Sequence, residues 1–97
     1  IDAIVKRIKK KVGDSPVYLS IDIDVLDPAF APGTGTPEIA GMTSREMVNV
    51  LRGLSGLNLI SADVVEISPA YDHAEITSLA AATIVYELIN LFAKRKR

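Results

Sequence analysis

The sequence has no cysteine, no tryptophan and a single histidine among its 97 residues. Without cysteine, the chain cannot form a disulfide scaffold, a thiolate metal site or a thiol nucleophile. Any bound metal must therefore be held by oxygen atoms or imidazole. An excess of charge of one sign is also lacking, because 11 Lys and Arg face 12 Asp and Glu. The resulting net charge of −1 argues against nucleic-acid binding by general electrostatic attraction.

Long uninterrupted hydrophobic runs are absent as well. The most apolar stretch, residues 79–93, contains Glu87 and Asn90 and falls short of the roughly 18 continuous apolar residues of a membrane span. We therefore expect a buried helix there and no membrane association. Hydrophobic residues make up 48% of the chain, which is typical of one soluble globular unit. The absence of cysteine agrees with a reducing, cytoplasmic location.

Hydrophobic periodicity predicts three helices and two strands. The expected helices cover residues 1–12, 43–55 and 72–93, and the expected strands cover residues 17–25 and 58–67. Capping patterns, Thr43 with Glu46 and Asp72 with Glu75, mark the starts of the second and third helices. Strands that alternate with helices predict a parallel sheet with helices on both faces. Two strands rarely stand alone, so we expect the missing strands on other sequence or on a second copy of the chain.

The chain also begins inside the periodic pattern of its first helix, at Ile1, without an initiator Met or a signal-peptide pattern. We therefore expect it to be a piece of a longer protein. The basic residues of that first helix are expected to form a solvated face. The basic tail, residues 94–97, is interpreted in the same way, because no aromatic-rich basic surface accompanies it.

Two aspartates on the first strand are the strongest chemical signal. Asp22 and Asp24 fall on the same side of the alternating strand, roughly 6 to 7 Å apart at about 3.3 Å per residue. Burying both charges costs several kcal/mol unless cations or hydrogen-bond donors compensate. Oxygen ligands favour Mg or Mn, and a pair of such metals can activate water. The alternative is that both aspartates cap neighbouring backbone or pair with Arg or Lys.

The residues around this pair resemble a known family. The run LSIDIDVLDPAFAPGTGTP, residues 19–37, resembles the ureohydrolases, the family of arginase and agmatinase. Two later segments, ADVVEISP at residues 62–69 and YDHAEIT at residues 71–77, look more like agmatinase than arginase. The resemblance extends from about residue 13 to residue 90. It implies the carboxyl-terminal part of an α/β, three-layer arginase-like domain, with about two strands and three helices.

The resemblance also implies a function for several residues. It implies a hydrolase with two Mn²⁺ ions that cleaves a guanidino C–N bond, most simply agmatine to putrescine and urea, with arginine and guanidinobutyrate as alternative substrates. Asp22 and Asp24 match metal ligands of the family, and Glu66 matches the carboxylate that receives the guanidinium. Thr36 falls in the loop that lines the substrate site. The family also leads us to expect a homo-oligomer.

The sequence departs from the family in one respect. The resemblance implies further metal ligands from an upstream His and an upstream Asp-x-His-x-Asp segment, and a further His for proton transfer. This chain contains none of them, and His73 lies in the wrong segment to replace them. We therefore expect residues 1–97 alone to be inactive and to supply no catalytic group.

Two other functions stay open. One is a non-catalytic α/β module for assembly or regulation that keeps half a metal site. The other is Mg²⁺-dependent phosphoryl chemistry, which is weaker because no Gly-rich phosphate loop opens a helix.

Three further polar residues have simpler interpretations. Asp27 precedes a proline and is expected to form a turn. Asp63 has the opposite strand parity to Glu66, which predicts a structural hydrogen bond. His73 lies beside a helix cap, where a solvent-facing imidazole is ordinary.

Overall fold

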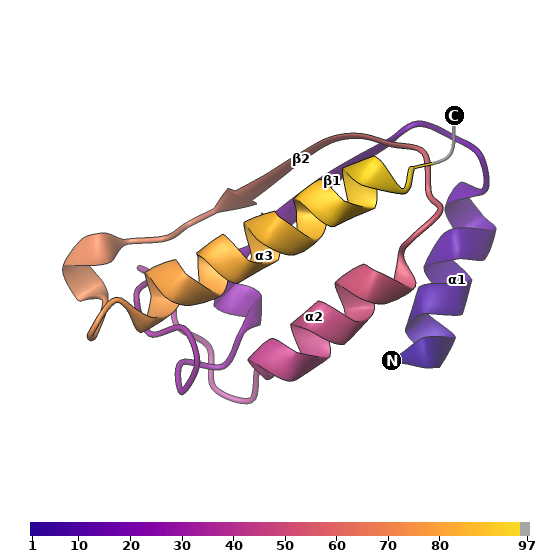
Figure 1. Ribbon diagram of the computed structural model, residues 1–97. Helices are drawn as coiled ribbons and strands as arrows, with labels where there is room; N and C mark the ends of the chain where they lie inside the picture. Colours follow the sequence, from indigo (N-terminus) through magenta and orange to yellow (C-terminus); the bar gives the residue numbers. More distant parts are fainter. Residues whose placement is uncertain (96–97) are drawn as a thin grey trace.

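The fold is that of a computed structural model in which residues 1–95 are described, so the last two residues of the basic tail lie outside the described part. The elements follow the predicted order of helix, strand, loop, helix, strand and helix (Figure 1). They are α1 (Asp2–Val12), β1 (Val17–Asp22), the 3-10 turn η1 (Ile23–Val25), α2 (Ser44–Gly53), β2 (Leu59–Val65), the 3-10 turn η2 (Pro69–Tyr71) and α3 (Ile76–Ala93).

The two strands form a parallel pair, as the alternation of strands and helices predicts. Ser20 lies opposite Asp63, and Asp22 lies opposite Val65. The register shifts between Val17 and Tyr18, which leaves Ile60 without a partner in the ladder. Since α2 makes the crossover between the strands, the carboxyl ends of β1 and β2 meet at the same edge of the sheet.

Within residues 1–95, helices cover only one face of the sheet, as is expected of part of a three-layer domain. α3 packs against β2 and against α2, and the side chain of Ile21 on that face is buried (Figure 1). On the opposite face Tyr18 and Ser20 are exposed. The physical reason is that only one face of this two-stranded sheet is apolar, and helices bury apolar faces.

The first strand is shorter than predicted. Its alternation continues through Val25 in the sequence, but the strand ends at Asp22 and the chain turns into η1. The Asp22 carboxylate accepts a hydrogen bond of 3.1 Å from the backbone N–H of Asp24, and this local bond competes with strand pairing. The turn also lets Ile23 and Leu26 enter the core, where both are fully buried.

The start of α2 confirms its predicted capping box. Thr43 Oγ1 accepts from the backbone N–H of Glu46 at 3.0 Å, and the Glu46 carboxylate accepts from the N–H of Thr43 at 2.9 Å. The buried face of α2 carries Met47 and Leu51, which join the core under α3.

The start of α3 differs from its prediction. The helix begins at Ile76, and Glu75 has a left-handed backbone (φ 61°) and makes no capping bond. Asp72 caps from further upstream, because its carboxylate accepts from the N–H groups of Thr77 at 3.0 Å and Ser78 at 3.1 Å. Desolvation raises the pKa of Asp72, but the hydrogen bonds from Thr77, Ser78 and His73 outweigh it and hold the pKa well below its ordinary value.

The long helix α3 is buried along one side only. Its buried residues are Thr77, Ile84, Glu87, Leu88 and Leu91. By length and composition it is the one helix among the described residues that could cross a membrane. Core helices of α/β domains share these properties, and the packing of α3 against α2 and β2 identifies it as such a helix here.

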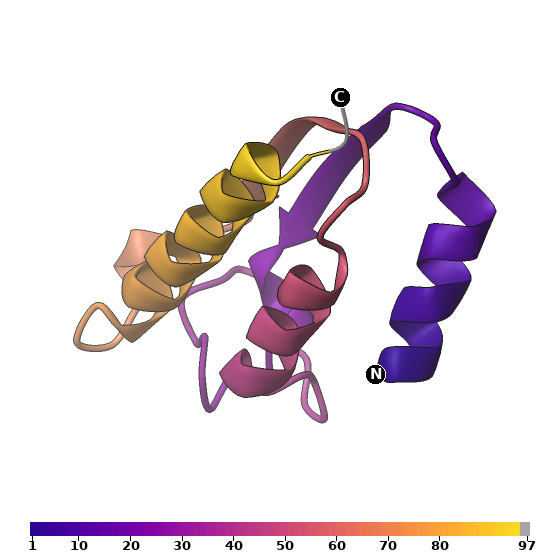
Figure 2. The ribbon, with the colours of Figure 1, turned by 45° about the vertical axis from the view of Figure 1, so that its right-hand side comes forward.

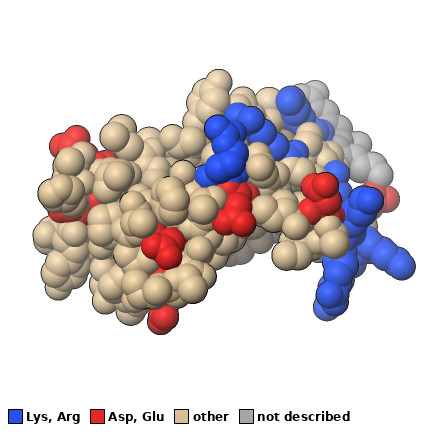
Figure 3. Space-filling view, turned by 90° about the horizontal axis from the view of Figure 1, so that it is seen from below, with Lys and Arg blue, Asp and Glu red and all other residues tan. Residues whose placement is uncertain are grey.

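The first helix packs beside α2 (Figure 2). Its basic residues lie mainly on the surface, as predicted, and blue side chains gather at the end of the molecule where α1 lies (Figure 3). Of its predicted apolar stripe only Val5 is buried, whereas Ile4 and Ile8 are exposed. The amphipathic pattern is therefore correct, but most of its apolar side has no cover within residues 1–95.

Candidate metal and substrate site

The two aspartates lie next to each other at the carboxyl end of β1. Asp22 is the last residue of the strand and Asp24 is the middle residue of η1, and both side chains are half-buried. The turn, and not strand alternation, makes them neighbours, so the predicted spacing along one continuous strand is wrong. The end of a parallel strand is where open α/β sheets bind ligands. The location of the pair at this end of the sheet agrees with the prediction.

Thr36 reaches the pair from the long loop that follows β1. Its Oγ1 donates a hydrogen bond to Asp24 Oδ2 at 2.7 Å. The predicted loop residue therefore contacts a predicted metal ligand directly. The sequence gives no signal for this bond, because the two positions are twelve residues apart and most of the chain between them is irregular loop.

The base of that loop is closed by backbone pairing. Asp27 N–H donates to Met42 O and Met42 N–H donates to Val25 O, both at 2.8 Å. Gly41 fits this closure because a Cβ there would lie 2.7 Å from Asp27 N and 2.8 Å from Val25 O. The Asp27 carboxylate accepts from the N–H groups of Ala29 (2.9 Å) and Ala40 (3.1 Å), which confirms that Asp27 is a turn former.

The middle of the loop is tied to two other segments through Gly33. Its N–H donates to Thr77 Oγ1 in the first turn of α3, and its carbonyl accepts from Ser68 N–H beyond β2, each at 2.7 Å. A Cβ at Gly33 would lie 2.9 Å from both Asp72 Cβ and Thr77 Oγ1. The sequence carries no clear signal for these bonds, because Thr77 is one of several polar residues on α3.

Glu66 follows β2 directly, with its backbone in the left-handed region (φ 68°) and its side chain exposed. Because Asp22 pairs with Val65, Glu66 comes to the same end of the sheet as the aspartates. Within residues 1–95 its carboxylate makes no hydrogen bond and no ion pair. A non-glycine residue at positive φ stores strain of about 1 to 3 kcal/mol, and such strain is concentrated at functional sites.

Asp63 lies on the open face of the sheet. It accepts hydrogen bonds from Ser20 Oγ at 2.6 Å and from the Tyr18 hydroxyl. Both hydrogen bonds lower the pKa of Asp63, and the bond from Ser20 has the larger effect. The predicted structural hydrogen bond is therefore confirmed. His73 is exposed beside the Asp72 cap, as predicted.

The aspartate pair provides part of a metal shell. No group of three or more His, Asp or Glu side chains that could hold a metal occurs among the described residues. Within residues 1–95 the ion pair of Arg52 with Glu87 includes neither aspartate, and no Lys or Arg pairs with either of them. Of the alternative interpretation, only backbone capping by Asp22 is observed. Two unneutralised hard oxygen donors fit a divalent cation that completes its coordination elsewhere.

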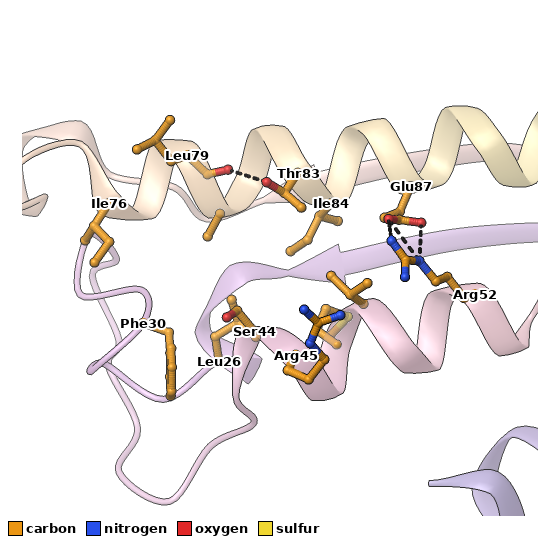
Figure 4. Close-up of a pocket in the computed structure, with 13 residues that line it drawn as sticks. Leu26, Phe30, Ser44, Arg45, Arg52, Ile76, Leu79, Thr83, Ile84 and Glu87 are labelled. Carbon is orange, nitrogen blue, oxygen red and sulfur yellow. Dashed lines mark hydrogen bonds and ion pairs between the residues drawn. The ribbon is translucent and has the colours of Figure 1, made fainter.

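A separate groove of about 550 Å³ lies between α2 and α3 (Figure 4). Leu26, Phe30 and Ile84 are among its apolar lining residues, and the ion pair of Arg52 with Glu87 (2.9 Å) also borders it. The aspartates, Thr36 and Glu66 are not among its lining residues. The groove is therefore distinct from the candidate site.

Comparison with known proteins identifies similar chains. The sequence model of the Arginase family matches residues 1–90. An agmatinase of Photorhabdus laumondii is 57% identical over 97 residues, which are 100% of this chain and 32% of that protein. A crystal structure of a hypothetical agmatinase from Burkholderia thailandensis matches 93% of this chain and 29% of its own, with 54% identity and a TM-score of 0.90.

A more distant match is arginase from Bacillus subtilis, with 30% identity and a TM-score of 0.80 over 90% of this chain and 32% of that one. These matches confirm the expected arginase-like α/β fold. The chain spans about a quarter to a third of the length of the curated relatives it matches.

Proposed function

Because this chain belongs to the arginase family, we propose that it forms the carboxyl-terminal part of a manganese-dependent ureohydrolase whose complete protein converts agmatine to putrescine and urea. The observation that carries the proposal is the meeting of Asp22, Asp24 and Glu66 at one end of the parallel sheet. Agmatine is the substrate we favour, because relatives that are 55% to 57% identical are named agmatinases.

Each carboxylate has a distinct task in this proposal. Asp22 and Asp24 offer oxygen ligands to the metals, and the remaining ligands come from sequence outside residues 1–95. When bound, divalent metals supply a nucleophile at neutral pH and stabilise developing negative charge. Glu66 binds the planar guanidinium by charge-assisted hydrogen bonds and so holds its carbon beside the metal ligands. Residues 1–97 alone supply no group for proton transfer and are therefore inactive.

The test is urea release by the complete protein loaded with Mn²⁺, with agmatine, arginine and guanidinobutyrate as substrates. We expect agmatine to be turned over fastest and the isolated 97-residue chain to release no urea. Glu66→Gln removes the anionic partner of the guanidinium and is expected to reduce kcat/KM by at least 100-fold, which corresponds to about 2.7 kcal/mol. Asp63→Asn, on the open face of the sheet, is the matched control and should retain activity.

The alternative of a non-catalytic module makes a different prediction. Such a module keeps the two aspartates as metal ligands but catalyses no reaction. The complete protein would then bind Mn²⁺ and release no urea from any guanidino compound. That result would replace the enzymatic proposal.

A further inference from the structure

Each carboxylate of the aspartate pair is held by one hydrogen bond, but the two donors differ in kind. Asp22 Oδ1 accepts from the backbone N–H of Asp24, a donor that every residue at position 24 except proline would supply. Asp24 Oδ2 accepts from the hydroxyl of Thr36. Among the described residues, the orientation of the Asp24 carboxylate therefore depends on one side chain.

The hydroxyl of Thr36 has a single proton. While it donates that proton to Asp24 Oδ2, the group has only lone pairs to offer to any other molecule. A guanidinium is a donor and could use a lone pair, but a hydrogen-bond acceptor would receive no hydrogen bond from Thr36. The bond to Asp24 is therefore the one directional interaction that the Thr36 proton makes in this structure.

The loop that carries Thr36 is fixed on both sides of that residue. The closure of Met42 on Asp27 holds the base of the loop, and the hydrogen bonds of Gly33 hold its middle against α3 and the segment after β2. Ala31 and Thr34 in this loop are buried. Such anchoring presents the Thr36 hydroxyl at a defined place beside Asp24.

We propose that Thr36 is a positioning residue that orients the Asp24 carboxylate toward a divalent cation. The inference deepens the proposed function and rests on it for the metal. A carboxylate oxygen has two lone pairs, so Oδ2 can accept the hydroxyl proton while the carboxylate binds a cation. Outer hydrogen bonds of this kind fix ligand orientation, and their loss typically weakens metal binding by about 10- to 100-fold.

The test compares three variants of the complete protein. Thr36→Val removes the hydroxyl and keeps the shape, whereas Thr36→Ser keeps the hydroxyl. Thr34→Val makes the same chemical change two residues away, at a buried hydroxyl that has no hydrogen-bond partner among the described residues. Equilibrium dialysis against Mn²⁺, with circular dichroism melting as a check of folding, gives the metal affinity of each.

We expect Thr36→Val to bind at least one Mn²⁺ about 10-fold more weakly than the wild type, and Thr36→Ser and Thr34→Val to stay within about two-fold. At saturating Mn²⁺ the KM of Thr36→Val for agmatine should match the wild type. Unchanged Mn²⁺ affinity in Thr36→Val overturns the inference, and a raised KM with unchanged affinity identifies Thr36 as a substrate contact.

The wild-type control separates this inference from the function it rests on. A wild-type protein that binds Mn²⁺ but releases no urea overturns the proposed reaction, while the affinity comparison still decides the role of Thr36. A wild-type protein that binds no Mn²⁺ overturns both.

Discussion

At the scale of single residues, two positions at the candidate site have unusual backbone requirements. Glu66 adopts a positive φ that glycine would adopt without strain, and Gly41 lies where any side chain would collide with backbone atoms. Glu66 therefore has a strained backbone although its side chain carries a carboxylate. At Gly41 the loop closure leaves no room for a side chain.

The strain at Glu66 predicts a trade between stability and activity. Glu66→Gly should raise the free energy of unfolding of the complete protein by about 0 to 1 kcal/mol. The reason is that relief of the backbone strain offsets the greater freedom of glycine in the unfolded chain. Urea release should nevertheless be lost. Denaturant titration measures the free energy of unfolding, with Glu66→Gln as the control that keeps the positive φ. A destabilisation well above 1 kcal/mol in Glu66→Gly would show that the carboxylate has a structural partner.

The loop closure at Gly41 predicts that adding a methyl group at this position lowers the stability of the protein. Gly41→Ala should destabilise the protein by about 1 to 3 kcal/mol, because the atoms it meets are backbone atoms of residues 25–27 and cannot move independently. Gly35→Ala is the matched control in the same loop, since no atom beyond the adjacent residues lies within 4 Å of a Cβ there. Equal unfolding midpoints for both variants in urea would contradict the described loop closure.

At the scale of elements, the cap of α3 links the helix to the loop that carries Thr36. Asp72 accepts from the first turn of α3, and Thr77 in that turn accepts from Gly33 of the loop. The end of the helix and the middle of the loop therefore order each other. Protonation of Asp72 should loosen both.

The lowered pKa of Asp72 predicts a pH dependence of stability. A carboxyl whose pKa is lower in the folded state stabilises the protein above its unfolded pKa, and this contribution is lost as the pH falls through the folded pKa. Asp72→Asn should therefore lower the Tm at pH 7, and its difference from the wild type should shrink below the ordinary pKa of 3.8. Glu75→Gln, which removes a carboxyl that makes no capping bond, is the control. Thermal unfolding at several pH values would disprove this if the difference stayed constant down to pH 2.

At the scale of the whole molecule, much apolar surface is uncovered within residues 1–95. Leu79 is 64% exposed, Tyr86 64% and Ile89 60%, and all three lie on α3. One face of the sheet is open, and most of the apolar stripe of α1 is exposed. Exposed apolar surfaces of this extent favour association with other protein surfaces.

The isolated 97-residue chain should accordingly form oligomers through α3. Light scattering at low micromolar concentration is expected to give a mass above that of the monomer. Ile89→Lys should reduce that mass, whereas Asn49→Lys, which places the same charge on the exposed side of α2, should not. A monodisperse monomer that unfolds independently of concentration would show that the chain is self-sufficient.

The sequence predicts most elements but fewer of the contacts between them. Periodicity and the Thr43 capping box are local, so the elements, their order and the parallel pairing follow from them. The end of β1 is not visible, because Ile23 and Val25 continue the alternation past the turn at Asp22. The left-handed backbone of Glu66 and the bond between Thr36 and Asp24 depend on how distant segments meet, and no local pattern encodes that meeting.

The two backbone hydrogen bonds of Gly33 have a consequence for genetic screens of the complete protein. Its N–H donates to Thr77 and its carbonyl accepts from Ser68, so these two hydrogen bonds hold the loop against the start of α3 and the segment after β2. A library selected for loss of urea release should therefore yield hits at Gly33, although this residue makes no hydrogen bond to Asp22 or Asp24 within residues 1–95. A smaller residue at Thr77 should not by itself suppress Gly33→Ala, because the added methyl group would still lie 2.9 Å from Asp72 Cβ and the acceptor of the Gly33 N–H would be lost.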